Sequence, residues 1–346
     1  MHILSTIFTF RFACFSRRTR PVVGLIANLL FVCPINVAFA QDLSYPTKSI
    51  RLIVPFTPGG TTDILARAIG QQLSIAWNQA VVIENVPGAG GSIGADKVAK
   101  AAPDGYTLLM GHIGTLAVNP TLYPNLPYDP IKHFAPVAWV ARVPNVLVVH
   151  PSLSAMTVAD LVKVSQQANA QGRVGLNYGS GGNGSAAHIA TEYFRQQTKS
   201  ELTHIPYRGT APGVTDLLAG QIQMMFTGAP AVMQHVRSGH LRALGVSSRD
   251  RMQAFPQLPT IAESGYPGFE ADQWYGIVAP AGISPAIVRK LNQQINVALT
   301  SKELKTRLQQ EGAEATPSAP QEFAALIVRE IARWKPVLIN GKVKPE

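Results

Sequence analysis

The chain has 346 residues, of which 46% are hydrophobic and 14% charged, and its formal net charge is +10. This length suffices for two domains of ordinary size, and the composition is that of a globular protein with a large core, which excludes an intrinsically disordered chain. Lys and Arg residues are scattered and aromatic residues do not alternate with them, so we expect no nucleic-acid partner.

The first 40 residues have the pattern of a secretory signal peptide. Four arginines precede the apolar run 22–40, which ends Ala38-Phe39-Ala40 before Gln41. Two asparagines and a proline interrupt this run, which disfavours a membrane anchor. We therefore predict a signal peptide over 1–40, cleaved near Ala40/Gln41, and a periplasmic mature protein. Its net charge would be +6, because the removed segment carries four arginines and no acidic residue, and it would hold neither of the two cysteines.

A strand, a glycine turn and a helix are predicted at the start of the mature chain. Apart from Arg51, residues 50–54 are apolar and mostly β-branched, which indicates a buried strand. The turn 55–60 contains two prolines and two glycines, and apolar residues recur at helical spacing over 64–77, with Thr61 or Thr62 as the N-cap. Such a turn directs backbone N–H groups at one point, where an anion can bind. A plain turn without a ligand is the alternative.

The same order of strand, glycine-rich loop and helix recurs along the chain, which predicts an α/β fold with polar loops at the carboxyl ends of its strands. Further strands are predicted over 80–84, 106–110, 174–178, 202–207 and 222–226. Residues 137–140 and 146–149 are expected to cross into the second domain, and the chain is expected to return through 241–246 and 272–280 to three C-terminal helices that begin near Ser284, Ser301 and Pro320. We expect two α/β domains joined by a double crossover. Domain 1 would be formed by 41–145 and 241–346, and domain 2 by 146–240.

Two enzymatic motifs are incomplete. A dinucleotide fingerprint from Gly88 and Gly90 would need a third glycine where Ile93 stands. The histidines lack the spacing of a metal site. We therefore predict no cofactor, no metal and no catalytic residue.

One arrangement leaves a hydrolase open as an alternative. Ser180 and Ser185 stand close in sequence to His188, a possible general base. However, Tyr178 occupies the first glycine position of a G-x-S-x-G elbow around Ser180. A periplasmic Ser/His hydrolase is thus the second hypothesis, and turnover of esters would distinguish it.

The mature chain resembles the Bug-type receptors of tripartite tricarboxylate transporters over essentially its whole length. The resemblance is carried, in chain order, by Tyr45-Pro46-Thr47-Lys48, residues 50–56, Pro58-Gly59-Gly60-Thr61-Thr62-Asp63, Asn85 with Gly88-Ala89-Gly90-Gly91, Pro103-Asp104-Gly105-Tyr106-Thr107-Leu108, Tyr207-Arg208-Gly209 and Pro259-Thr260-Ile261-Ala262-Glu263-Ser264-Gly265. It implies a two-lobed type II periplasmic binding protein fold. It also implies a solute-binding protein that captures a small carboxylate between its domains and delivers it to the transporter's membrane subunits. A monomer is expected, and a receptor that presents its ligand to a signalling protein would have the same sequence features.

The resemblance also implies a set of ligand-binding residues, contributed by both domains. In this chain they are Phe56, Thr57, Gly59, Gly60, Asp63, Gly90, Gly91, Gly111, His112 and Thr115 of domain 1, and Tyr178, Ser180, Gly182, Ser185, His188, Tyr207, Arg208 and Thr227 of domain 2. Structural alternatives exist, since the glycines suit tight turns. Asp63 and Arg67 are four residues apart on the predicted helix and can pair there, so that Asp63 would orient the loop.

The predicted ligand lacks a cationic centre. Many relatives carry an acidic residue after the strand 222–226, where this chain has Thr227-Gly228. An acid there could bind an ammonium group, so its absence disfavours an amino acid. We expect a mono- or dicarboxylate, aliphatic or aromatic.

Overall fold

The computed structural model describes residues 44–170, 175–341 and 343–344. The predicted signal peptide and its cleavage site lie outside these residues. Within them, no helix combines the length and the apolar character that crossing a membrane requires.

The first of two sheets contains three parallel strands at one side and antiparallel strands at the other. Its order is β11-β4-β10-β3-β1-β2. The strands are β1 (Ile50–Val54), β2 (Val81–Asn85), β3 (Thr107–His112), β4 (Phe134–Val143), β10 (Gln273–Pro280) and β11 (Glu314–Ala315). β1 is parallel to β2 and β3, so their carboxyl ends lie at one edge. This sheet with its helices is called lobe 1 below.

The second sheet repeats this design with the order β7-β6-β8-β5-β9. Its strands are β5 (Asn145–Val149), β6 (Leu176–Ser180), β7 (Leu202–Pro206), β8 (Met224–Gly228) and β9 (Arg242–Val246). β6 is parallel to β7 and β8. This sheet with its helices is called lobe 2 below. β9 pairs with β5, whereas the predicted domain division at 240 would place it in domain 1. We propose that domain 2 includes β9.

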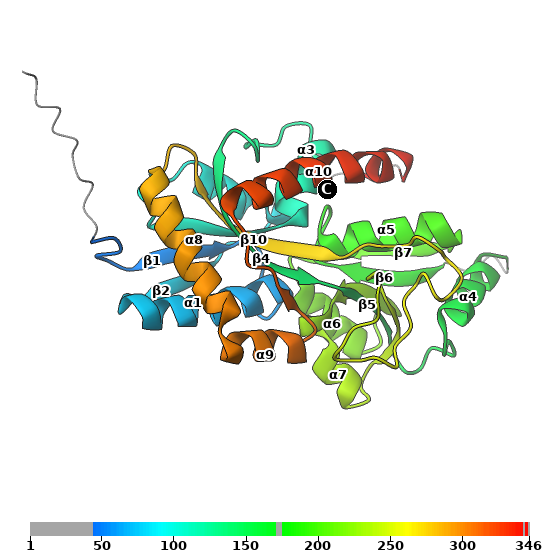
Figure 1. Ribbon diagram of the computed structural model, residues 1–346. Coiled ribbons are helices and arrows are strands. Elements are labelled where there is room, and N and C mark those ends of the chain that lie inside the picture. Colours follow the sequence, from blue (N-terminus) through cyan, green and yellow to red (C-terminus); the bar gives the residue numbers. More distant parts are fainter. Residues whose placement is uncertain (1–43, 171–174, 342, 345–346) are drawn as a thin grey trace, which may run out of the picture. The chain divides into compact units, whose positions relative to one another are not determined.

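Helices cover both sheets (Figure 1). The α-helices are α1 (Thr61–Trp77), α2 (Ser92–Ala99), α3 (Asn119–Leu122), α4 (Val158–Ala170), α5 (Ala186–Thr198), α6 (Thr210–Leu218), α7 (Met233–Arg237), α8 (Pro285–Thr300), α9 (Lys302–Gln310) and α10 (Pro320–Asn340). Short turns of other helix types form η1 (Ala89–Gly91), η2 (Gly114–Val118) and η3 (Ala229–Ala231). The three predicted C-terminal helix starts are confirmed to within one residue.

Two segments cross between the lobes. β4 continues into β5 through Pro144, and the chain returns along 247–272 from β9 to β10. The C-terminal helix α10 also reaches lobe 2, where Gln196 of α5 donates to the carbonyl oxygen of Val337 at 3.0 Å (Figure 1). One buried hydrophobic cluster contains side chains of both sheets, among them Leu109 and Phe226. The lobes therefore share part of their core.

Several strand bounds differ from the prediction for a common reason. β3 and β8 continue to His112 and Gly228, two residues past the predicted ends, because antiparallel neighbours from distant parts of the chain pair with these residues. The predicted N-cap of α1 was wrong. Gly60 has the extended backbone of an N-cap, and Thr61 already lies within the helix.

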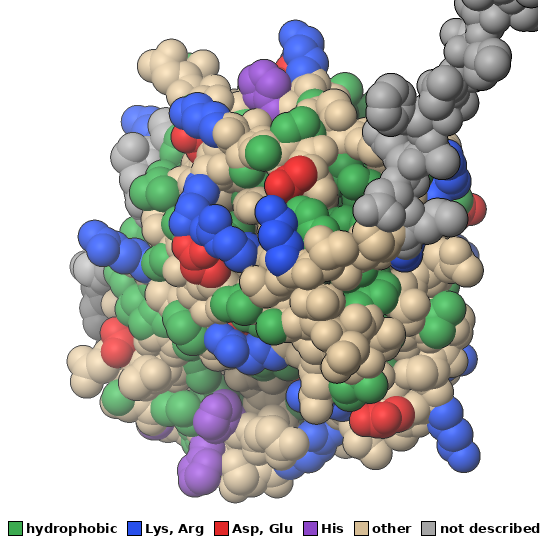
Figure 2. Space-filling view, turned by 90° about the vertical axis from the view of Figure 1, so that its left-hand side faces the viewer, with side chains coloured by type: hydrophobic (Ala, Val, Ile, Leu, Met, Phe, Trp, Pro, Cys, Tyr) green, Lys and Arg blue, Asp and Glu red, His purple; other side chains and the backbone are tan. Residues whose placement is uncertain are grey.

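Basic side chains are spread over the surface. Figure 2 shows Lys and Arg on one face of the molecule, separated by uncharged side chains and interspersed with acidic ones. Several basic residues pair with acids, as Arg51 does with Glu84 at 2.6 Å across β1 and β2. This face therefore carries no continuous basic stripe of the kind that binds nucleic acid.

Candidate functional site

Three helices from the two lobes begin at one small cavity. α1 of lobe 1 follows its N-cap Gly60, and α5 and α6 of lobe 2 follow Ser185 and Gly209. The cavity, called the inner chamber, has a volume of about 20 Å³, enough for about one water molecule. It is lined by Phe56, Gly60, Thr62, His112, Gln273 and Tyr275 of lobe 1 and by Gly181, Ser185, Ala186, Ala187, Thr210 and Thr227 of lobe 2.

A larger cavity adjoins it. This outer chamber has a volume of about 260 Å³ and shares Phe56 and Gly181 with the inner chamber. Its other lining residues are Pro87, Gly88, Ala89, Gly90, Gly91 and Ile93 of lobe 1 and Gly182, Tyr207 and Arg208 of lobe 2. The loops after β1, β2, β6 and β7 thus line two neighbouring cavities between the lobes.

The electrostatics of the inner chamber favour an anion held by neutral donors. None of its lining residues is Lys, Arg, Asp or Glu. Each helix N-terminus carries unpaired N–H groups and a partial positive charge. Burial lowers the pKa of His112 to about 4, so this histidine is neutral at pH 7.

Asp63 orients the first loop. One of its carboxylate oxygens accepts from the Gly59 backbone N–H at 3.0 Å and from Arg67 at 2.9 Å, and the other accepts from Asn85 at 3.0 Å. Burial by itself raises the pKa of this carboxyl, but the hydrogen bonds from Arg67, Gly59 and Asn85 outweigh burial and lower it. Both oxygens are therefore committed within lobe 1, which favours the structural alternative for Asp63.

A buried histidine stack supports the loop that precedes α5. The rings of His188 and His204 are stacked with centroids 3.9 Å apart. His188 Nδ1 accepts from the Gly184 N–H at 3.1 Å, and His204 Nε2 pairs with the Ser180 hydroxyl at 2.6 Å. Burial lowers the pKa of His188 to about 4, and burial together with the neighbouring His188 lowers that of His204 to about 3. Both rings are neutral at pH 7.

The geometry does not form the proposed hydrolytic pair. The Ser185 hydroxyl caps α5 by accepting from the backbone N–H of His188 at 3.3 Å, while the His188 ring is bonded to Gly184. The serine that does contact a histidine ring, Ser180, is fully buried. Neither serine is therefore an exposed nucleophile beside a free base.

Comparison with known proteins places the chain in a family. The sequence profile described as the tripartite tricarboxylate transporter family receptor, TctC, matches residues 65–342. The chain belongs to this family. Protein BugT of Bordetella pertussis is 41% identical over 323 residues, which cover 93% of this chain and 96% of BugT.

Solved structures of proteins with similar sequences agree with this family assignment. R. palustris Rpa4515 with adipate is 39% identical with a TM-score of 0.84, over 87% of this chain and 100% of that one. MatC of Rhodopseudomonas palustris with bound malate is 33% identical with a TM-score of 0.80, over 85% of this chain and 100% of MatC. The chain has the two-lobed type II periplasmic binding protein fold, as predicted. Its relatives are solute-binding receptors, and membership of the family implies a periplasmic location.

More than half of the residues that we predicted to bind ligand line the two chambers of this receptor. They are Phe56, Gly60, Gly90, Gly91, His112, Gly182, Ser185, Tyr207, Arg208 and Thr227. The others are not lining residues of either chamber: Thr57, Gly59, Asp63, Gly111, Thr115, Tyr178, Ser180 and His188. Thr115 exemplifies them, since its hydroxyl and N–H both bond to His112 and hold that side chain in place. Ligand contact by any of these residues remains a prediction.

Sequence reasoning missed two lining residues that lie far from the glycine loops. Gln273 and Tyr275 belong to β10, where the sequence predicted only that the chain returns towards its C-terminal helices. They reach the inner chamber because β10 is inserted next to β3, with Tyr275 opposite His112. The sequence feature that could have indicated these residues is a polar side chain, Gln273, at the start of an otherwise apolar run.

Proposed function

We propose that this receptor captures a small dicarboxylate between its lobes and delivers it to the membrane subunits of a tripartite tricarboxylate transporter. The observation that carries the proposal is the meeting of three helix N-termini, from both lobes, at a chamber without Lys or Arg. Such N-termini bind anions in proteins generally. One oxygen of a ligand carboxylate would occupy the inner chamber, which has room for about one water molecule.

The outer chamber supports a second carboxylate. Arg208 is its one cationic lining residue. A ligand that extends from the inner to the outer chamber would place its far end beside this guanidinium. The structures of similar proteins with adipate and with malate agree with a dicarboxylate. The lining residues of both chambers include no Asp or Glu, which disfavours a ligand with an ammonium group.

Affinity requires that the lobes close. A helix N-terminus stabilises an anion by about 0.3–1 kcal/mol, whereas a micromolar complex needs about 8 kcal/mol. Three N-termini are therefore insufficient, and desolvation between the lobes with contacts from both must supply the rest. The receptor would thus bind by domain closure.

A ligand panel tests the proposal. Thermal unfolding of the purified, ligand-stripped protein would be measured with malate, adipate, hexanoate, citrate, aspartate and glutamate, because a ligand that binds only the folded state raises the Tm. We expect a dicarboxylate to raise the Tm and hexanoate, which has the length of adipate but one carboxylate, to bind at least tenfold more weakly by calorimetry. Tight binding of the amino acids alone would contradict the proposal, as would ester hydrolysis.

A further inference from the structure

Asn145 occupies the point where the chain crosses between the lobes. It is the first residue of β5, directly after Pro144, and is fully buried. Its backbone N–H donates to the Ser247 hydroxyl at 2.8 Å, and its carbonyl oxygen accepts from the Ser247 N–H at 2.9 Å. The first crossing segment is therefore bonded to the start of the second.

The side chain of Asn145 adds two bonds to the other end of the second crossing. Its Nδ2 donates to the carbonyl oxygen of Ala271 at 2.6 Å, and its Oδ1 accepts from Nε2 of Gln273. One amide thus joins both crossing segments, and its orientation is determined because donor and acceptor are each paired.

The bonds continue from Asn145 into the inner chamber. Oε1 of Gln273 accepts from the Tyr275 hydroxyl. Both side chains are nearly fully buried and both line the chamber. A ligand in this chamber would therefore contact side chains that are bonded to the crossing.

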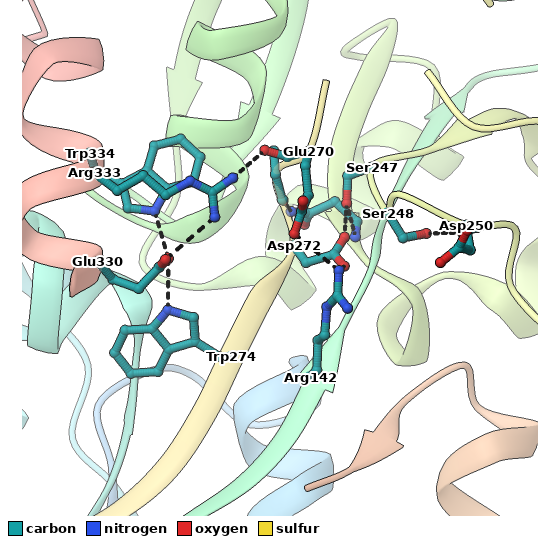
Figure 3. Close-up of polar contacts among 12 residues, drawn as sticks. Arg142, Ser247, Ser248, Asp250, Glu270, Asp272, Trp274, Glu330, Arg333 and Trp334 are labelled. Carbon is teal, nitrogen blue, oxygen red and sulfur yellow. Dashed lines mark hydrogen bonds and ion pairs between the residues drawn. The ribbon is translucent and has the colours of Figure 1, made fainter. Parts of the chain in front are cut away.

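A second set of contacts, between charged side chains, holds residues 270–272 of the same crossing segment (Figure 3). The Ser247 hydroxyl donates to Asp272 at 2.6 Å, and Asp272 pairs with Arg142 of β4 at 2.8 Å. Arg142 also pairs with Glu270 at 3.1 Å, and Arg333 of α10 donates to the Glu270 carbonyl oxygen at 2.8 Å. Lobe 1 thus holds the end of the second crossing segment, residues 270–272, and the side chain of Asn145 joins β5 of lobe 2 to this end.

We propose that Asn145 is a positioning residue that couples occupancy of the inner chamber, through Gln273, to the angle between the lobes. This inference rests on the proposed function, since it assumes that ligand occupies the chamber. Hydrogen bonds weaken steeply when their geometry is disturbed, so a rotation at the crossing would break the bonds of Asn145 together. A ligand stabilises the closed state only by contacts that differ between the open and closed states, and the Gln273–Asn145 contact supplies such a difference.

The test compares inter-lobe distances in Asn145→Ala with those in the wild type. Spin labels at Gln71→Cys of α1 and Thr215→Cys of α6, both exposed, report the distance between lobes in the full chain, with Cys14 and Cys33 changed to Ser. We expect a single narrow distance distribution in the wild type and a broad one in Asn145→Ala. With adipate as the probe, Asn145→Ala should dissociate about tenfold faster, with an association rate within twofold of the wild type.

Matched variants separate coupling from general destabilisation. Asn292→Ala also removes an amide that bonds to two backbone carbonyls, those of Val137 and Ser318, but it lies on α8 within lobe 1. It should keep the wild-type distance distribution and dissociation rate. Gln273→Met breaks the same link from the other end and should broaden the distribution, and adding Asn145→Ala to it should cause no further change.

Every outcome of these measurements either supports or overturns the proposed role of Asn145. A wild-type distance distribution in Asn145→Ala, or equal broadening in Asn292→Ala, would overturn the inference. If Asn145→Ala does not fold, Gln273→Met alone provides the same comparison. If the wild type binds neither adipate nor any other carboxylate of the panel, the proposed function fails, while the distance distributions without ligand still show whether Asn145 holds the crossing.

Discussion

His188 and His204 illustrate how single side chains shape the ligand loop. Each accepts or shares one hydrogen bond with the segment 180–184, and each is kept neutral by burial. A protonated His188 could no longer accept from the Gly184 N–H, because Nδ1 would carry a proton. The loop geometry therefore depends on the neutral state of both rings.

This dependence predicts a loss of stability in mild acid. The folded-state pKa values of about 4 and about 3 lie below the value of about 6.5 in the unfolded chain. The unfolded state thus takes up protons first, and stability that is fully present above pH 6.5 is lost as the pH falls towards 4. The double variant His188→Asn, His204→Gln, which retains hydrogen-bonding side chains, should lose less, by on the order of 4 kcal/mol at pH 5, about half of it from each ring. Thermal and urea unfolding across pH 4–8 measure this, and identical pH profiles for the two proteins would contradict it.

At the scale of elements, the start of α5 combines a structural and a binding role. Ser185 caps the helix and also lines the inner chamber. Ser301 makes the same kind of cap at α9, accepting from Leu304 N–H at 3.3 Å, but does not line either chamber. The two serines therefore form a matched pair.

Ser185→Ala and Ser301→Ala should each lower the free energy of unfolding by about 1 kcal/mol, because each helix loses a side-chain acceptor at its N-terminus. Only Ser185→Ala should also weaken binding of the dicarboxylate identified in the panel, by about threefold to tenfold. Urea unfolding and calorimetry give the two quantities. Equal affinities in the two variants would exclude the Ser185 hydroxyl from ligand binding.

At the scale of the whole molecule, the two lobes approach each other closely at a glycine, Gly90. Gly90 of lobe 1 has φ +58°, and an added Cβ would lie 2.3 Å from the carbonyl oxygen of Asn183 in lobe 2. The Tyr123 hydroxyl donates to that same oxygen at 3.2 Å. The two lobes therefore approach so closely at Gly90 that there is no room for a side chain.

Gly90→Ala should consequently hold the lobes apart and weaken ligand binding at least tenfold. Gly239→Ala is the control, since Gly239 has a similar φ of +76° but open space at the Cβ position. Both variants carry backbone strain, so they should be destabilised alike, and only Gly90→Ala should increase the radius of gyration in solution scattering. An unchanged affinity in Gly90→Ala would show that binding does not require this closure.

The sequence by itself determined most of the longer elements and their order, because β-branched runs, glycine turns and helical spacing are local signals. It also determined the family, and more than half of the residues that it indicated as ligand-binding line the chambers, since these lie in short loops directly after strands. Asp63 shows the limit of local reasoning, because its spacing to Arg67 allowed both a ligand contact and an ion pair.

Only the tertiary structure decided which residues meet. Asn145, Gln273 and Tyr275 are separated from the glycine loops by many residues and come together because β10 is inserted beside β3 and the chain crosses twice between the sheets. The same pairing extended β3 and β8 past their predicted ends. Contacts between distant segments depend on sheet order, and no local pattern in the sequence carries that order.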